Sequence, residues 1–399
     1  MNSFEKLPAE TRQILNSLPA LINKTFPLPS RFRGALPSDI AELSRLLTSQ
    51  RGGRSLSYLS RPNFLSAYMH YFLPWNLFRL CILLKDLDIP LSQGSVITDL
   101  GSGPLTFITA LWISRPDLRN VPLEVNCVDR CAPALEAGKK FFDSLSSGAE
   151  SPWKINCIRE DIDIRKTETI KKIKHASLVC AVNMFNEIYD NIPHNNPEKL
   201  RLTAVNAAKL MHNQALKNAY LFTAEPGIPQ SGKFISLLRC EFLKLDRPAV
   251  SPCTHLNPCP YDPFKLKKIK KWCHFAYEAV NAPEELRRLS AASKIPKERL
   301  VLSYLLTGPV SQEKESHPAA KTGAEEVRVI SDIFKLQNSL FGRYGCCSKG
   351  LVLLTGERNH MEKINSGSLV NFKNNTPVFA ANGQRDAKSG ALIMAAKIT

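Results

Sequence analysis

The chain has 399 residues, of which 44% are hydrophobic, enough for two or three compact units with apolar cores. No stretch is long and apolar enough to cross a bilayer, and the start mixes Glu5 and Glu10 with Lys6 and Arg12, unlike a targeting leader. We expect a bacterial cytoplasmic protein, monomeric when free and without membrane contact. The net charge of +17 favours a polyanionic partner, RNA or DNA, over a merely basic surface. The 11 cysteines, an odd number, favour metal ligands or core thiols over a disulfide framework.

Residues 1–90 are predicted to form an N-terminal helical region. Ile40, Leu43, Leu46 and Leu47 recur at the spacing of one helical face, and the glycines that follow end the helix. A different pattern begins near residue 91, where short β-branched runs alternate with helical segments. This alternation predicts an α/β domain over residues 91–310 with a parallel, doubly wound sheet. Its strands are expected in "GSVITDLGSGP", "PLEVNCVDRCAP", "ASLVCAVNMFNEI" and "AYLFTAEPG".

A cysteine-rich, proline-rich insertion at residues 251–275 interrupts this pattern, and "ERLVLSYLLTG" resumes it as another strand. Residues 311–326 are polar and contain helix breakers, so they are predicted to form a loop or linker. Residues 327–399 hold short strand-like runs such as "KGLVLLTGE", which predict a small C-terminal β appendage.

The end of the first predicted strand has the residues of a nucleotide-type turn. Ligands bind at strand carboxyl ends in open α/β sheets, and glycines allow the backbone to approach them closely. The acids that end the next two strands would accept hydrogen bonds from a ribose hydroxyl and an adenine amino group. A dinucleotide-binding domain is the competing interpretation, although it needs a glycine where Thr106 stands, and a tight turn without a ligand is another. The predicted cofactor-binding residues are Asp99, Gly101, Ser102, Gly103, Asp129 and Asp161.

This arrangement resembles the class I S-adenosylmethionine-dependent methyltransferase fold over residues 92–310, in its Asp-x-Gly-x-Gly turn and second-strand acid. The resemblance implies S-adenosylmethionine as cofactor, although Leu105 stands where a third glycine is common. Amino-methylating enzymes carry Asx-Pro-Pro-aromatic after the fourth strand, where this chain has Met184 and Phe185 in place of the prolines. The candidate catalytic residues there are Asn183, Asn186 and Glu187, of which the last two could equally cap the next helix.

The insertion contains a Cys-x5-Cys-x13-Cys pattern formed by Cys253, Cys259 and Cys273, with a fourth thiol available at Cys346 or Cys347. Four thiolates suit either tetrahedral zinc or an iron–sulfur cluster, and the irregular spacing is unlike that of a zinc ribbon. Independent buried cysteines are the alternative interpretation. His255 and His274 are further candidate ligands, although loop histidines more often make ordinary hydrogen bonds.

The pattern "SPCTHLNPCP" with "WCHF", downstream of "ITDLGSGPLT" and upstream of "YGCCSKGLVLL", resembles the methyltransferase-like assembly factors of the ribosomal small subunit. That family has a mitochondrial branch and bacterial relatives. The resemblance implies a four-iron, four-sulfur cluster held by Cys253, Cys259, Cys273 and a fourth cysteine, best matched by Cys347, which precedes a short turn ending in Gly350. It also implies binding to small-subunit RNA and a role in subunit maturation. Zinc remains the alternative metal.

The lysines beside the third cysteine are predicted to bind RNA phosphates, with an aromatic side chain to stack on a base. The leading hypothesis is a ribosomal-RNA methyltransferase or a factor derived from one. One alternative is an RNA-binding assembly factor without methyl transfer, and another is a cytosine-5 RNA methyltransferase with Cys259 as nucleophile. The predicted RNA-binding residues are Lys265, Lys267, Lys268, Lys270, Lys271 and Trp272.

Overall fold

A computed structural model of the protein describes residues 3–48, 58–150, 153–166, 170, 173–190, 192–193, 196–264, 272–311, 326–371 and 379–396. The chain forms two compact units. Unit 1 comprises Met1–Pro193, Asn213–Leu216 and Tyr277–Leu300, and unit 2 comprises His194–His212, Lys217–Ala276 and Val301–Thr399. The three-part division predicted from the sequence, at residues 1–90, 91–310 and 327–399, stays a prediction.

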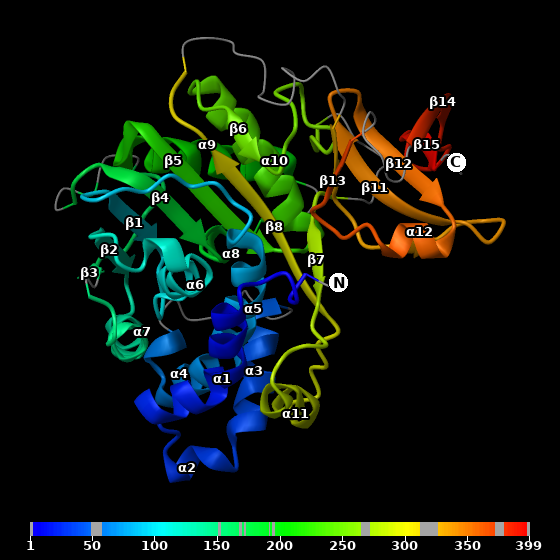
Figure 1. Ribbon diagram of the computed structural model, residues 1–399. Coiled ribbons are helices and arrows are strands. Elements are labelled where there is room, and N and C mark those ends of the chain that lie inside the picture. Colours follow the sequence, from blue (N-terminus) through cyan, green and yellow to red (C-terminus); the bar gives the residue numbers. More distant parts are fainter. Residues whose placement is uncertain are drawn as a thin grey trace. The chain divides into compact units, whose positions relative to one another are not determined.

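Unit 1 begins with the helices that the sequence predicts. In α3, Ile40 and Leu43 of the predicted apolar face are buried together with Leu36, whereas Leu46 and Leu47 are partly buried. In α5, apolar side chains surround most of the helix, and nearly all of them are buried. The helices of this region are α1 (Ala9–Thr25), α2 (Ser30–Arg33), α3 (Leu36–Thr48), α4 (Pro62–Ala67) and α5 (Leu73–Leu84), with short turns η2 (Tyr58–Ser60) and η3 (Tyr68–Phe72) (Figure 1).

Four parallel strands of unit 1 lie in the order β3-β2-β1-β4. They are β1 (Val96–Leu100), β2 (Glu124–Asp129), β3 (Lys154–Arg159) and β4 (Ala176–Val182). Since β2 pairs with one edge of β1 and β4 with the other, the chain crosses in opposite directions on the two sides of β1. The carboxyl ends of β1 and β4 therefore mark the switch point at which such sheets bind ligands. The helices after these strands are α6 (Thr106–Ser114), α7 (Ala132–Ser146) and α8 (Phe185–Tyr189), and unit 1 also holds η4 (Pro116–Leu118) and α11 (Glu284–Ala292).

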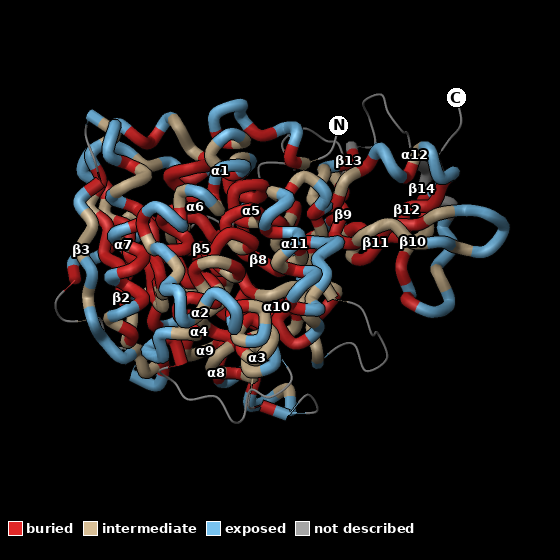
Figure 2. Tube along the Cα trace, turned by 90° about the horizontal axis from the view of Figure 1, so that it is seen from below, coloured by how far each residue is buried: buried red, intermediate tan, exposed pale blue. Residues whose placement is uncertain are grey.

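Unit 2 holds most of β5 (Ala215–Pro226), β6 (Ala249–Ser251) and β8 (Arg299–Thr307), in the order β5-β8-β6, and β7 (Phe275–Glu278) also pairs with β8. β8 is antiparallel to both β5 and β6, so the predicted all-parallel sheet is wrong and the sheet is mixed. The apolar run "LVLSYLL" fits a buried strand of either direction, which is why its sequence does not reveal the reversal. Figure 2 shows β5 and β8 as largely buried trace. The helices are α9 (Pro197–Gln214) and α10 (Pro229–Lys244).

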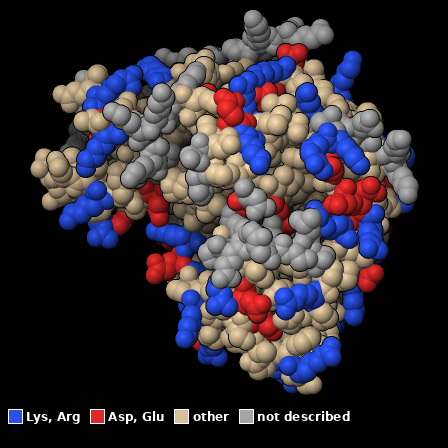
Figure 3. Space-filling view, turned by 180° about the vertical axis from the view of Figure 1, so that it is seen from behind, with Lys and Arg blue, Asp and Glu red and all other residues tan. Residues whose placement is uncertain are grey.

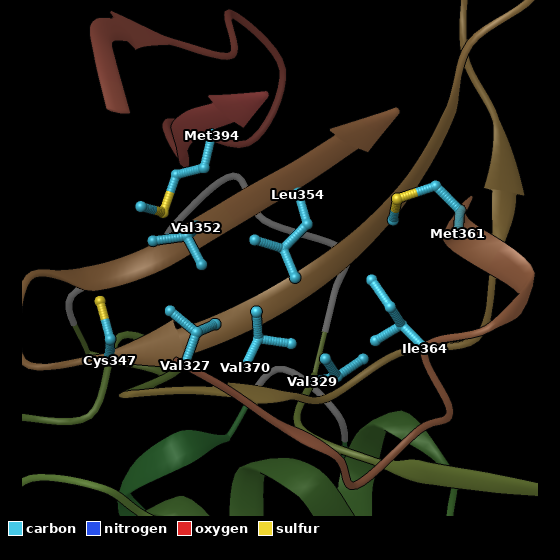
Figure 4. Packing of buried hydrophobic residues seen from close by; sticks show 9 residues of the cluster. All are labelled: Val327, Val329, Cys347, Val352, Leu354, Met361, Ile364, Val370 and Met394. Atoms are coloured by element: carbon cyan, nitrogen blue, oxygen red, sulfur yellow. The ribbon is translucent and has the colours of Figure 1, made fainter. Parts of the chain in front are cut away.

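A second sheet at the C-terminal end of unit 2 confirms the predicted β appendage. Its strand order is β13-β9-β11-β12-β15-β14, and β10 pairs with β11. Valines and larger apolar side chains from several of these strands form its core, with Met361 of α12 (Arg358–Glu362) (Figure 4). The strands are β9 (Glu326–Val329), β10 (Phe334–Lys335), β11 (Phe341–Cys347), β12 (Gly350–Gly356), β13 (Leu369–Asn371), β14 (Phe379–Arg385) and β15 (Leu392–Ala396).

Candidate functional site

The turn after β1 places its backbone in a conformation suited to a close approach by a ligand. Gly101, Gly103 and Leu105 all have positive φ values, of 67°, 53° and 56°. A Cβ at Gly101 would come within 2.6 Å of Met184, whereas a Cβ at Gly103 would project into open space. Leu105 adopts the left-handed conformation for which glycine is usual, at a cost of about 1 kcal/mol, and its side chain is completely buried.

Asp99, near the end of β1, stabilises this turn through its side chain. Its side chain is 1% exposed, and its Oδ2 accepts a hydrogen bond of 2.6 Å from the Ser102 hydroxyl. The Cys180 thiol, on the neighbouring strand β4, donates to its Oδ1 over 3.4 Å. Burial raises the pKa of Asp99 to about 7, against the lowering effect of these two hydrogen bonds. Asp99 therefore supports the turn and is partly protonated at neutral pH.

Asp129, at the end of β2, lies directly against the same turn. Its Oδ2 accepts a hydrogen bond of 2.9 Å from the Gly103 amide, and its Oδ1 accepts one of 2.8 Å from the Cys131 amide. Each carboxylate oxygen has two lone pairs, so both retain capacity for a further donor. Helix α7 approaches the turn so closely at Gly138 that a Cβ there would overlap backbone atoms of Pro104. The structure thus brings Asp99, Gly101, Ser102, Gly103 and Asp129 together.

Asp161 stands apart from this group. It follows the end of β3, its side chain is 70% exposed, and it forms an ion pair of 3.2 Å with Arg130. An exposed ion pair of this kind contributes at most about 1 kcal/mol to stability. Its predicted contact with an adenine amino group stays a prediction.

The end of β4 carries the three candidate catalytic residues. Asn183 has a positive φ of 53°, and its Oδ1 accepts a hydrogen bond of 2.7 Å from Arg79 of α5. Glu187 Oε1 accepts one of 3.0 Å from the hydroxyl of Tyr58. Asn186 is buried, and α8 begins after Met184 without a side-chain cap. The N-terminal helical region therefore supplies side chains that fix Asn183 and Glu187 in place.

In unit 2, the cysteine-rich loop is held by Arg239 of α10. Arg239 Nε donates to Cys253 Sγ over 3.2 Å, and its Nη2 donates to the carbonyl oxygens of His255 and Asn257 over 2.8 Å and 2.9 Å. Cys273, the third cysteine of the pattern, has its carbonyl bound by the Ser303 hydroxyl at 2.8 Å. The loop and the strand after it are thereby fixed to their own unit through side chains distant in sequence.

The two adjacent cysteines on β11 have different surroundings. Cys347 is fully buried in the core of the second sheet, beside Val327 and Val352 (Figure 4). Neighbouring residues of a strand point to opposite faces, so Cys346 faces the other way. Its Sγ lies 3.3 Å from His255 Nε2, and its strand partner Arg328 donates to the carbonyl oxygen of Pro252 over 3.0 Å. The structure thus places Cys346, rather than the predicted Cys347, with the cysteine-rich loop.

Four thiols, those of Cys253, Cys259, Cys273 and Cys346, are close enough to influence one another. Burial raises the pKa of Cys259 to about 11, and the charge of Cys253 adds to the effect. Burial and the neighbouring thiols likewise raise the pKa of Cys273 and Cys346 well above the usual value. Within the described residues, no group of three or more His, Cys, Asp or Glu side chains has the arrangement of a metal-ion site. The role of Cys259 as the covalent nucleophile of a cytosine-5 methyltransferase stays a prediction.

The residues that we predict to bind RNA are described only in part. Lys265, Lys267, Lys268, Lys270 and Lys271 lie outside the described residues. Trp272 is half-buried, and its indole nitrogen donates to the Gly227 carbonyl over 3.0 Å, while its ring lies 4.9 Å from that of His274. On the face that Figure 3 shows, basic side chains are spread among acidic ones and do not form a single patch.

Several residues at these sites were not found by sequence reasoning. Arg79 and Tyr58 act on the end of β4, and Arg239 acts on the cysteine loop, from helices that carry no motif. The sequence signal for Arg79 and Arg239 was their position among apolar residues of a helix, where a charged residue needs a partner, and Tyr58 carried no such signal. None of the helices in the described ranges is both long and apolar enough to cross a membrane.

Comparison with solved structures finds methyltransferases of low sequence identity. A putative class I S-adenosylmethionine-dependent methyltransferase from Listeria monocytogenes is 10% identical, with a TM-score of 0.35, over 78% of this chain and 90% of that chain. A methyltransferase from Geobacter sulfurreducens in complex with S-adenosyl-L-homocysteine is 10% identical, with a TM-score of 0.31, over 59% and 91%. One from Agrobacterium tumefaciens is 14% identical, with a TM-score of 0.34, over 59% and 62%. No curated protein matches the sequence.

The parallel strands of unit 1 and the glycine turn after β1 define an α/β protein with a switch point of the kind that binds ligands. A family model described as mitochondrial small ribosomal subunit Rsm22 matches residues 67–339, more than half of the chain. The chain belongs to the Rsm22 family. The match includes Cys253, Cys259 and Cys273 and ends before Cys346. The bacterial cytoplasmic location stays a prediction.

Proposed function

We propose that this protein binds S-adenosylmethionine at the turn after β1 and acts as a methyltransferase on the RNA of the small ribosomal subunit. We also propose that Cys253, Cys259, Cys273 and Cys346 hold a four-iron, four-sulfur cluster. The observation that carries the cofactor proposal is the geometry at Gly103, whose amide donates to Asp129 and whose missing side chain leaves open space. A ribose beside Asp129 would approach the backbone through that space.

The residues at the end of β4 are the candidates for positioning the methyl acceptor. Methyl transfer requires an acceptor lone pair in line with the methyl group, so the main contribution of a protein is orientation. Asn183 is held by Arg79, and Glu187 by Tyr58, which fixes two polar groups beside the switch point of unit 1. Asn186 would support them from its buried position on α8.

The chemistry of the thiol group supports the cluster. Four cysteines can bind every iron of such a cluster, so it would cross-link the chain and leave no open position for substrate. The loop with Cys253 and Cys259, the segment with Cys273 and strand β11 with Cys346 would be joined, and closing long loops restricts the unfolded chain. The buried cation of Arg239 beside Cys253 suits thiolates, which are negatively charged.

The RNA proposal is supported by family membership and by net charge. The description of the family names the mitochondrial small ribosomal subunit, and the chain carries a net charge of +17. The lysines at 265–271 would neutralise RNA phosphates next to Cys273, so an ordered cysteine loop would present them. Trp272 binds its own chain through Gly227 and His274, and this contact would keep its ring fixed beside those lysines.

Calorimetry with S-adenosylmethionine on wild-type protein, Gly103→Leu and Gly94→Leu tests the cofactor site. Gly94 is the matched control, because it also has a positive φ and open space at its Cβ, so leucine must adopt a positive φ at both positions. We expect Gly103→Leu to abolish measurable binding and Gly94→Leu to bind like the wild type. Equal affinity in all three proteins would place the cofactor elsewhere. No binding by the wild type would favour an RNA-binding assembly factor without methyl transfer.

A further inference from the structure

Unit 2 contains a buried guanidinium whose charge is not balanced by a carboxylate. Arg239 is 2% exposed, and within the described part of the chain it forms no ion pair with Asp or Glu. Burying an isolated cation is strongly unfavourable unless it is paired and hydrogen-bonded. The residues around Arg239 must therefore supply the compensation.

That compensation comes from the cysteine-rich loop. Arg239 Nε donates to the sulfur of Cys253, and Nη2 donates to the carbonyl oxygens of His255 and Asn257. The three acceptors lie within five consecutive residues, 253–257, so the planar guanidinium binds both ends of this short segment of the loop. Asn257 continues the contact, since its side-chain amide donates to the Ser348 carbonyl over 3.0 Å, just after β11.

The third nitrogen of the guanidinium is in a different state. Nη1 is buried and has no hydrogen-bond partner among the described residues. The guanidinium thus contacts the Cys253 sulfur directly through Nε and has one buried donor still available.

We infer that Arg239 is the positioning residue of the thiol site, which holds the loop of Cys253 in its binding conformation and supplies the counter-charge for a bound thiolate cluster. This inference rests on the proposed function, in which the four thiols hold a four-iron, four-sulfur cluster. One-electron reduction adds a negative charge to an already anionic group. A fixed cation and an N–H···S hydrogen bond stabilise the reduced form more than the oxidised form, and so raise the reduction potential.

The chain offers a matched control in Arg247. It is also in unit 2 and is 1% exposed, but it hydrogen-bonds to His212 and to the carbonyl oxygens of Ala219 and Gly308. A substitution at Arg247 therefore removes a buried guanidinium without changing the charge next to Cys253. Any effect on the cluster that Arg239→Gln has and Arg247→Gln lacks belongs to the thiol site.

The test is a dithionite titration of the full-length protein without oxygen, followed by electron paramagnetic resonance, together with iron and sulfide analysis. We expect Arg239→Gln to reduce the equilibrium constant for reduction about tenfold, which is about 59 mV for one electron. Arg239→Lys keeps the positive charge but loses the planar guanidinium, so its shift in reduction potential should be smaller. Arg247→Gln should leave the potential unchanged. Loss of the cluster in both Arg239 variants, with the cluster retained in Arg247→Gln, would also support the inference.

An unchanged potential and full iron content in Arg239→Gln would overturn the inference while leaving the cluster in place. Equal effects of Arg239→Gln and Arg247→Gln would overturn it as well, because they would assign the effect to general destabilisation. A wild-type protein that holds no iron and sulfide would contradict the proposed function itself. These results are distinct, so each proposal can fail separately.

Discussion

The turn after β1 and the thiol site are built in different ways. The turn site gathers residues from the ends of neighbouring parallel strands, and its contacts join backbone amides to nearby side chains, such as the Gly103 amide to the Asp129 carboxylate. The thiol site gathers Cys253, Cys259, Cys273 and Cys346 from a loop, a strand entry and a second sheet. The difference shows that the first site is formed by the folding of regular β-α units, whereas the second depends on side chains distant in the chain, and we expect its order to depend on the proposed cluster.

The largest effect is expected on the iron and sulfide content of the thiol site, in a comparison of Cys346→Ser with Cys347→Ser. The two residues are adjacent on β11, but one faces the cysteine loop and the other lies in the apolar core. We expect Cys346→Ser to lose nearly all iron and sulfide, because one thiolate ligand is removed. Cys347→Ser should keep its metal and lose some thermal stability through the buried hydroxyl.

Metal analysis of both variants after anaerobic purification measures this. If only Cys347→Ser lost iron, Cys347 would be the fourth ligand, as the sequence predicted. The assignment of Cys346 from the alternation of side chains along β11 would then be wrong.

Gly138→Ala tests how closely the turn site depends on local packing. A Cβ at Gly138 would overlap backbone atoms of Pro104, which cannot move away as a flexible side chain would. We expect a loss of about 3 kcal/mol in the free energy of unfolding and weaker S-adenosylmethionine binding. Gly148→Ala is the control, since its Cβ meets no atom within 4 Å. Urea unfolding followed by circular dichroism measures the stability, and calorimetry measures the binding. Equal stability of the two variants would show that the contact between Gly138 and Pro104 is not as close as described.

The smallest expected effect concerns the buried acid of the turn site. Burial raises the pKa of Asp99 to about 7, above the value of about 3.9 in an unfolded chain. The protonated form is therefore favoured by folding, so its stabilisation is complete below pH 4 and is lost as the pH rises through 7. Relative to Asp99→Asn, the wild type should lose about 2.6 kcal/mol of stability between pH 5 and pH 8. Parallel stability curves of the two proteins over this range would show that Asp99 titrates normally.

Local patterns allowed much of unit 1 to be predicted and less of the thiol site. The helical face at Ile40 and Leu43 and the strand-turn-helix around Asp99 follow from periodicity and turn chemistry within short segments. The antiparallel direction of β8 could not be read from its apolar run, because burial on both faces hides strand direction. Likewise, two adjacent cysteines give no sign of which one faces the loop, since that depends on the register of β11 against β9.

The most direct test of the central claim is the iron and acid-labile sulfide content of the wild-type protein, purified without oxygen, together with its visible absorption spectrum. The account predicts about four iron and four sulfide per chain and a brown protein, as the proposed four-iron, four-sulfur cluster requires. One zinc per chain with no sulfide and no visible absorption would contradict it.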